Sequence, residues 1–182
     1  MDLIAEQRMP SFPSQEVAVL LPLVVGLVTT LATIAVHAVA LAAIIHFVRR
    51  EFCLGRAGVR FQRDVAIVAG VTVVALTAHL VDLTVWALVL DSCGEFARLG
   101  DAFYHSAVNY SSLGYGDIVM SNSWKLLGAL EAANGLLMFG VSTSMIFAVA
   151  QQLVQTRFGP LPSLGEERLG NQREHRSQLD DR

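Results

Sequence analysis

Charged residues are almost absent from three long stretches of this sequence. No Asp, Glu, Lys or Arg occurs from Val17 to Val48, only Asp82 occurs from Val65 to Leu90, and only Glu131 occurs from Leu126 to Ala150. Each stretch is longer than the about 20 residues that cross the hydrocarbon core of a bilayer. Only 16% of the chain is charged, whereas soluble domains carry about 25%. The sequence therefore predicts an integral membrane protein with three spans.

Further absences narrow the class of membrane protein. The two cysteines, Cys53 and Cys93, allow at most one disulfide within a chain, and their spacing fits no metal site, so both are expected to be free thiols. The segment before the first span lacks a basic region, and the span is too long for a cleavable signal, so a retained helix is predicted. No arginine ladder of a voltage sensor is present, because the first two spans contain no Arg or Lys.

Arginines gather in the loop between the first two spans. Because basic loops remain in the cytoplasm, this loop is predicted to be cytoplasmic, with the N-terminus outside and the C-terminus inside the cell membrane. The acidic segment 91–101 then lies outside, which agrees with the rule that basic loops stay in the cytoplasm. The arginines of the loop are Arg49, Arg50, Arg56, Arg60 and Arg63.

The chain is expected to hold one membrane domain with flanking segments. Its end is rich in mixed charges, Pro and Gly and has little apolar periodicity, so it is predicted to be disordered. The predicted segments are an extracytoplasmic N-terminus (1–16), an additional transmembrane helix (17–48), a basic cytoplasmic loop (49–63), a two-span domain (64–156) and a cytoplasmic tail (157–182).

A short apolar stretch and a glycine-containing loop separate the last two spans. Residues 101–111 are too few to cross a membrane and predict a re-entrant helix, with Asp101 capping its start. The loop "SSLGYGDI" (111–118) follows. Irregular backbone at membrane depth persists only where it is buried in protein or lines a water-filled path. The sequence thus predicts half a helix entering the membrane and an irregular chain leaving it.

The alternation of glycine with larger residues in this loop suits ion coordination. Gly114 and Gly116 can adopt positive φ, so successive carbonyls can point at one axis and replace the hydration shell of an ion. Leu113 and Tyr115 then direct their side chains away from the axis, and Ser112 adds a hydroxyl. One chain supplies only one wall, so several chains in cyclic symmetry are expected.

"SSLGYGD" resembles the Thr-Val-Gly-Tyr-Gly-Asp signature of potassium channels, and residues 64–155 resemble the small bacterial two-helix pore proteins of that superfamily. The resemblance implies an all-α membrane fold and a homotetramer that conducts K⁺ passively. It implies no enzyme activity, no cofactor beyond the permeant ion, and no partner other than copies of the chain and membrane lipid, with no nucleic acid. The implied elements are an outer helix (64–90), a pore helix (101–111), a filter (112–117) and an inner helix (124–156).

The resemblance also implies roles for individual residues. Ser112 and Leu113 replace the usual Thr and Val, and His105 takes the place of a common aromatic, with Tyr115 or Asp117 as its expected partner. The implied K⁺ ligands are Ser112, Leu113, Gly114 and Tyr115; the outer mouth is Gly116 and Asp117; the filter supports are His105, Asn109 and Glu131; the pore lining is Leu137, Val141, Ser144, Ala148 and Gln152; and the hinge candidates are Gly135 and Gly140.

Several alternatives remain open from the sequence. Ser144 can instead bond to a carbonyl of its own helix, the glycines can serve helix packing, and Glu131 can be a water-reachable group near the interface. His105 either gains charge in mild acid or stays buried and neutral.

For the function, one alternative is a weakly selective cation channel. A second, from another class, is a redox protein that binds haem through His37 and His79. His79 and Asp82, three residues apart on a helix, also suggest a proton relay.

Overall fold

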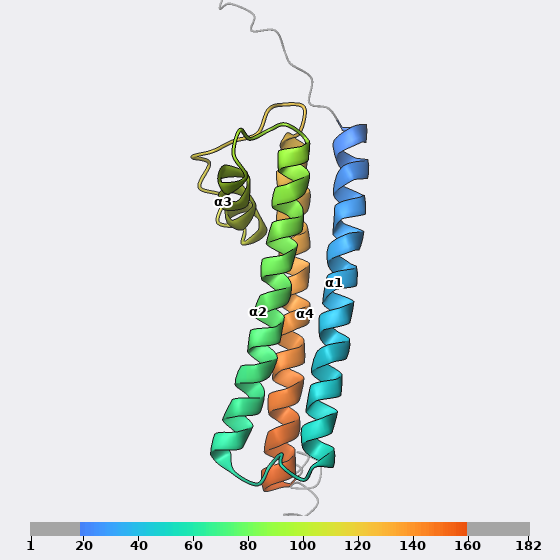
Figure 1. Cartoon of the computed structure of the whole chain (residues 1–182), viewed down its shortest axis with the longest axis vertical. Helices are drawn as coiled ribbons and strands as arrows, with labels where there is room; N and C mark the ends of the chain where they lie inside the picture. Colours follow the sequence, from blue (N-terminus) through green and yellow to red (C-terminus); the bar gives the residue numbers. More distant parts are fainter. Residues whose placement is uncertain (1–18, 160–182) are drawn as a thin grey trace, which may run out of the picture. The chain divides into compact units, whose positions relative to one another are not determined.

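The structure is a computed structural model that describes residues 19–159. Within them lie three long helices and one short one, drawn in Figure 1: α1 (Leu20–Cys53), α2 (Phe61–Ser92), α3 (Leu99–Tyr110) and α4 (Lys125–Phe158). The helices α1, α2 and α4 are each long and apolar enough to cross a membrane. This part of the chain is all-α and fits a multi-pass membrane protein. The predicted N-terminal segment and residues 160–182 of the predicted tail lie outside the described residues.

The helices form two compact units, each of which is described by itself. The first, called here the α3 unit, comprises residues 19–39 and 77–140, and the second, called the loop unit, comprises residues 40–76 and 141–159. The α3 unit holds α3, the loop after it and the adjoining parts of the three long helices. The loop unit holds the connection between α1 and α2.

Glycines in the left-handed conformation end α1 and α2. Gly55 has φ 62° and donates its N–H to the Phe52 carbonyl, and Gly94 has φ 75° and donates to the Asp91 carbonyl. Such a residue satisfies carbonyls that the last helical turn leaves free. α1 therefore extends to Cys53, past the first arginines, and the basic loop is shorter than the predicted 49–63. The helix outlasts its apolar run because arginine is favoured at a helix C-terminus.

α1 docks in the α3 unit through small and polar residues. In this unit most of its large side chains are exposed, as Leu27 and Leu31 show. Gly26 approaches Leu130 of α4 so closely that a Cβ there would overlap its side chain. Thr33 accepts a 2.9 Å hydrogen bond from the Asn134 amide of α4. Small residues and interhelical hydrogen bonds are the usual means of helix association in membranes. The buried residues of this stripe are Pro22, Gly26, Thr29, Thr33 and His37.

α3 packs against α2 and α4 within the α3 unit. Trp86 and Leu90 of α2, Tyr110 of α3 and Leu127 of α4 form its fully buried core. The end of α3 comes close to Gly135 of α4: a Cβ there would overlap the Tyr110 carbonyl oxygen and lie 2.8 Å from its carbonyl carbon. Only glycine permits this approach.

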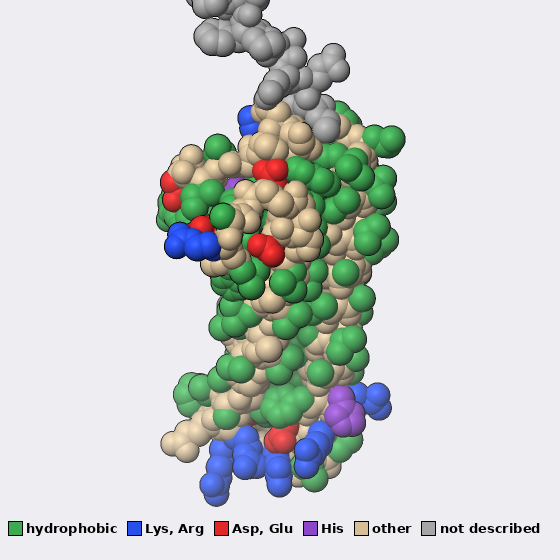
Figure 2. Space-filling model, turned by 45° about the horizontal axis from the view of Figure 1, so that its top comes forward, with side chains coloured by type: hydrophobic (Ala, Val, Ile, Leu, Met, Phe, Trp, Pro, Cys, Tyr) green, Lys and Arg blue, Asp and Glu red, His purple; other side chains and the backbone are tan. Residues whose placement is uncertain are grey.

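The loop unit has an apolar core and one half-buried ion pair. Arg157 of α4 donates to Asp64 of α2 at 2.6 Å, and the other Asp64 oxygen accepts the Gly58 N–H at 2.8 Å. Asp64 thus holds the α1–α2 connection against the end of α4. Figure 2 shows blue Lys and Arg side chains gathered at this end of the unit. The five arginines named from the sequence are all exposed.

Candidate functional site

The loop 111–118, called here the GYG loop, has an alternating backbone. Ser112, Gly114 and Gly116 have φ of 60°, 58° and 71°, whereas Leu113 and Tyr115 between them have negative φ. A sign of φ that changes at every residue is compatible with carbonyls that face one side of the chain. The left-handed serine was not predicted, because positive φ was expected only at the glycines.

The start of the GYG loop is tied to the end of α3. The Val108 carbonyl accepts the N–H of Leu113 at 2.9 Å and that of Gly114 at 3.3 Å, and Ser112 donates to the Asn109 carbonyl at 2.8 Å. These bonds satisfy carbonyls at the helix end that would otherwise lack a partner. The position of α3 therefore fixes where the alternating segment begins.

Tyr104 of α3 holds the other end of the loop. Its hydroxyl donates a 2.8 Å hydrogen bond to Asp117. This bond lowers the pKa of the exposed Asp117 carboxyl below its usual range and raises the pKa of Tyr104, so Asp117 is ionised at neutral pH. Sequence reasoning named neither Tyr104 nor this pair. The tyrosine one residue before His105 was the available signal.

His105 bonds to the backbone after the loop rather than to the expected side chains. Its Nδ1 lies 3.1 Å from the Ile118 carbonyl oxygen, and its Nε2 lies 2.8 Å from the Asn109 amide nitrogen. The amide donates, so Nε2 accepts and Nδ1 carries the proton. The expected partners Tyr115 and Asp117 are thus wrong for His105: successive helical residues point in different directions, and Tyr104 is the one that reaches Asp117. His105 and Asn109 instead brace one another beside the loop.

Acidification tests whether His105 stays neutral. Burial lowers its pKa below the ordinary value, against the Ile118 carbonyl and the Asp117 and Glu95 carboxylates, which raise it. Below about pH 6.5 the unfolded chain binds a proton that folded His105 does not. We expect the thermal unfolding temperature to fall as the pH drops below this value and His105→Phe to reduce the fall. Superimposable curves for parent and variant, in thermal scans from pH 8 to 5, would contradict this.

Glu131 and Ser106 connect α4 to the back of α3. The Ser106 hydroxyl hydrogen-bonds to Glu131 Oε1 and lies 3.2 Å from the Leu83 carbonyl oxygen of α2. Glu131 and Ser106 are fully buried. A water-reachable interfacial position for Glu131, left open from the sequence, does not match this burial. Its support of the GYG loop through α3 stays a prediction.

Glu95 is a second support that sequence reasoning missed. Its carboxylate accepts the Ser121 N–H at 2.6 Å and the Ser121 hydroxyl at 2.7 Å. The chain before α3 is thereby joined to the chain after the GYG loop. Asp101, predicted to cap α3, lies in its first turn instead and pairs with Arg98, the residue at the cap position, at 3.1 Å.

The α4 residues predicted to line a pore share an exposed face. All five (Leu137, Val141, Ser144, Ala148 and Gln152) are exposed in the single chain. Leu136 and Phe147 on another face are exposed to 61% and 67%, so exposure alone does not separate pore from lipid. The Ser144 hydroxyl donates to the Val141 carbonyl at 2.8 Å, the alternative left open from the sequence. Of the hinge candidates, Gly135 is enclosed by Tyr110, whereas Gly140 has open space around it.

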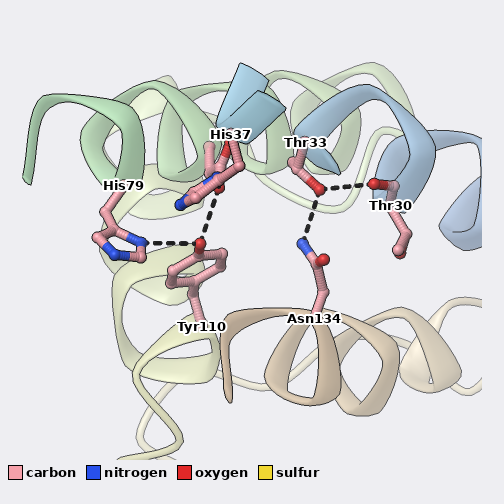
Figure 3. A network of polar contacts seen from close by, with 7 residues as sticks. Thr30, Thr33, His37, His79, Tyr110 and Asn134 are labelled. Carbon is pink, nitrogen blue, oxygen red and sulfur yellow. Dashed lines mark hydrogen bonds and ion pairs between the residues drawn. The ribbon is translucent and has the colours of Figure 1, made fainter. Parts of the chain in front are cut away.

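His37 and His79 meet in the α3 unit, as Figure 3 shows. Their ring centroids lie 4.8 Å apart with the planes tilted by 58°, so the rings contact each other and leave no slot for a macrocycle. This geometry counts against the haem alternative. Asp82 lies 2.9 Å from His37, and the Tyr110 hydroxyl stands between Asp82 and His79. His79 and Asp82 are therefore linked through the Tyr110 hydroxyl, and the direct contact that the suggested relay requires is not formed.

Comparison with known proteins supports one class. Residues 74–152 match the family model described as "Ion channel". The match covers the end of the chain's second span, α3, the GYG loop and most of α4. No curated protein matched the chain, and no solved structure did. The match supports an ion channel subunit.

Proposed function

We propose that this chain is the subunit of a potassium-selective channel, in which four copies surround one conduction path. The observation that carries the proposal is the alternating backbone at Ser112, Gly114 and Gly116, placed between two membrane-spanning helices. Carbonyls on one side of such a segment replace the hydration shell of K⁺. Ser112, Leu113, Gly114 and Tyr115 would supply the oxygens, with Gly116 and Asp117 at the mouth and α3 as the pore helix.

The exposure of the loop in a single chain supports assembly. Leu113, Tyr115 and Val119 are exposed to 59%, 66% and 69%. Irregular backbone at membrane depth requires cover by protein or a water-filled path, and one loop per chain cannot enclose an ion. A ring of identical chains both covers the loop and encloses the ion. The arginine-rich α1–α2 loop would lie in the cytoplasm, with the N-terminus outside and the C-terminus inside.

Recording in planar bilayers tests the proposal. Under a tenfold K⁺ gradient with Na⁺ opposed, the reversal potential should follow the K⁺ gradient by about 59 mV, the value for one elementary charge. The same sample in nanodiscs should have the protein mass of four 19.7 kDa chains. A reversal potential that follows Na⁺ equally would favour the weakly selective cation channel, and monomers alone would contradict the assembly.

A further inference from the structure

A buried polar cluster in the α3 unit lies apart from the GYG loop. His37 of α1 and His79 and Asp82 of α2 are exposed to only 6%, 6% and 0%. Tyr110, the last residue of α3, also belongs to this cluster and is drawn below His37 in Figure 3. Ionisable side chains within membrane spans are costly and are retained where they have a function. The channel function proposed above does not use this cluster.

The polar atoms of the cluster lie close enough together to converge on one metal ion. His37 Nδ1 lies 2.9 Å from Asp82 Oδ2, which lies 2.8 Å from the Tyr110 hydroxyl, which lies 3.1 Å from His79 Nδ1. The ligand atoms of the two histidines and Asp82 all lie within 4.8 Å of one another. With metal–ligand bonds of about 2.1 Å, adjacent ligands lie about 3–3.4 Å apart. The His37–Asp82 pair at 2.9 Å already has about this spacing, and binding of an ion would draw the wider pairs together.

Hydrogen bonds within the protein leave the cluster incompletely satisfied. Neither ring nitrogen of His37 has a hydrogen-bond partner, although Nδ1 is close to Asp82, and Asp82 Oδ1 has none either. A buried polar atom without a partner costs about 1–3 kcal/mol. A cation between the imidazoles and the carboxylate would satisfy the lone pairs that face one another here.

We propose that His37, His79 and Asp82 bind a divalent first-row transition metal ion, Zn²⁺ foremost, and that Tyr110 orients Asp82 through its hydrogen bond. Two imidazoles and one carboxylate are a donor set that Zn²⁺ accepts. Hydrogen-bonded partners of metal ligands fix their orientation, and the Tyr110 hydroxyl holds the Asp82 oxygen in this way. The ion would join α1 to α2.

The site gives the first helix a specific role. α1 contributes His37, which nothing in the two-span domain replaces. Because Tyr110 immediately precedes the GYG loop, an ion held by Asp82 would also restrain the point from which that loop starts. Binding of the ion does not depend on K⁺ conduction, so this inference and the proposed function can fail separately.

The test measures Zn²⁺ on the purified full-length chain without a polyhistidine tag. After loading with ZnCl₂ and removal of excess ion, elemental analysis should find about one Zn²⁺ per chain. His37→Gln should bind Zn²⁺ more than about 100-fold more weakly, since changes to outer partners alone cost about 10–100-fold. His46→Gln is the matched control, because His46 is an exposed histidine on α1 and should leave binding unchanged.

A second variant distinguishes loss of the metal site from misfolding of the chain. Asp82→Asn keeps the size of the side chain and an acceptor for Tyr110 but loses the charge, so Zn²⁺ should be lost while size-exclusion behaviour stays that of the parent. Less than a tenth of an equivalent of Zn²⁺ on the parent would overturn the proposal. So would equal binding by parent and a folded His37→Gln or Asp82→Asn.

Discussion

Gly135→Ala is expected to prevent stable assembly of the protein. The added Cβ would overlap the Tyr110 carbonyl oxygen and lie 2.8 Å from the carbonyl carbon. Both are backbone atoms at the end of α3, so no side-chain rotation relieves the overlap. Overpacking lowers the free energy of unfolding by about 1–3 kcal/mol, and we expect a clash with backbone atoms to cost about 3 kcal/mol. If four chains assemble as proposed, each carries this cost.

Gly140→Ala is the matched control for this change. Gly140 lies five residues further along α4, and a Cβ there would meet nothing within 4 Å. In a helix interior, alanine is about 0.5–1 kcal/mol more favourable than glycine, so this variant should be at least as stable as the parent. Thermal unfolding and assembly mass in nanodiscs measure both variants. Normal assembly of Gly135→Ala with altered opening would favour the hinge role over close packing.

Gly114→Ala is expected to abolish selective K⁺ conduction. Gly114 has φ 58°, and an L-residue in the left-handed region costs about 1–2 kcal/mol. A return to negative φ would turn the neighbouring carbonyls away from the common side of the chain. The loss should appear in the bilayer recording as the disappearance of currents that reverse near the K⁺ potential.

Gly55→Ala separates the loss of coordination from general backbone strain. Gly55 has φ 62°, and, as at Gly114, a Cβ would meet nothing within 4 Å. It lies in the α1–α2 connection, so its alanine variant should carry a similar cost and still conduct K⁺ selectively. Selective currents from Gly114→Ala would show that the GYG loop is not the filter, and loss from both variants would show that the effect is general backbone strain.

The membrane helices could be predicted from the sequence because one local property decides them. A run of residues with almost no charge can be found without knowledge of its neighbours, and from Leu20 on each such run lies within a long helix. The positive φ of Gly114 and Gly116 was predicted for a similar reason, since glycine carries its conformational freedom with it. Helix ends were less predictable, since α1 continues through Arg49 and Arg50.

Contacts between distant residues could not be predicted. Whether Tyr104 or His105 reaches Asp117 depends on the rotation of α3 about its own axis, which spacing along the chain does not fix. The contact of His37 with Asp82 depends on which face of α1 meets α2. Ser112 has φ 60° because the backbone hydrogen bonds of Ser112 and Leu113 to α3 hold it there. The residue type alone does not reveal this constraint.

α1 buries its small and polar residues and exposes its large apolar ones, and this arrangement determines whether the two-span domain can be separated from it. Residues 74–152, which match the channel family model, bury two polar side chains, Asp82 and Asn134, against α1. Without α1, Asn134 would lose its Thr33 partner, and Asp82 would lose His37 and keep only the hydrogen bond from Tyr110. Transplanting those residues into another two-span protein would therefore require either the first helix or apolar replacements at both positions.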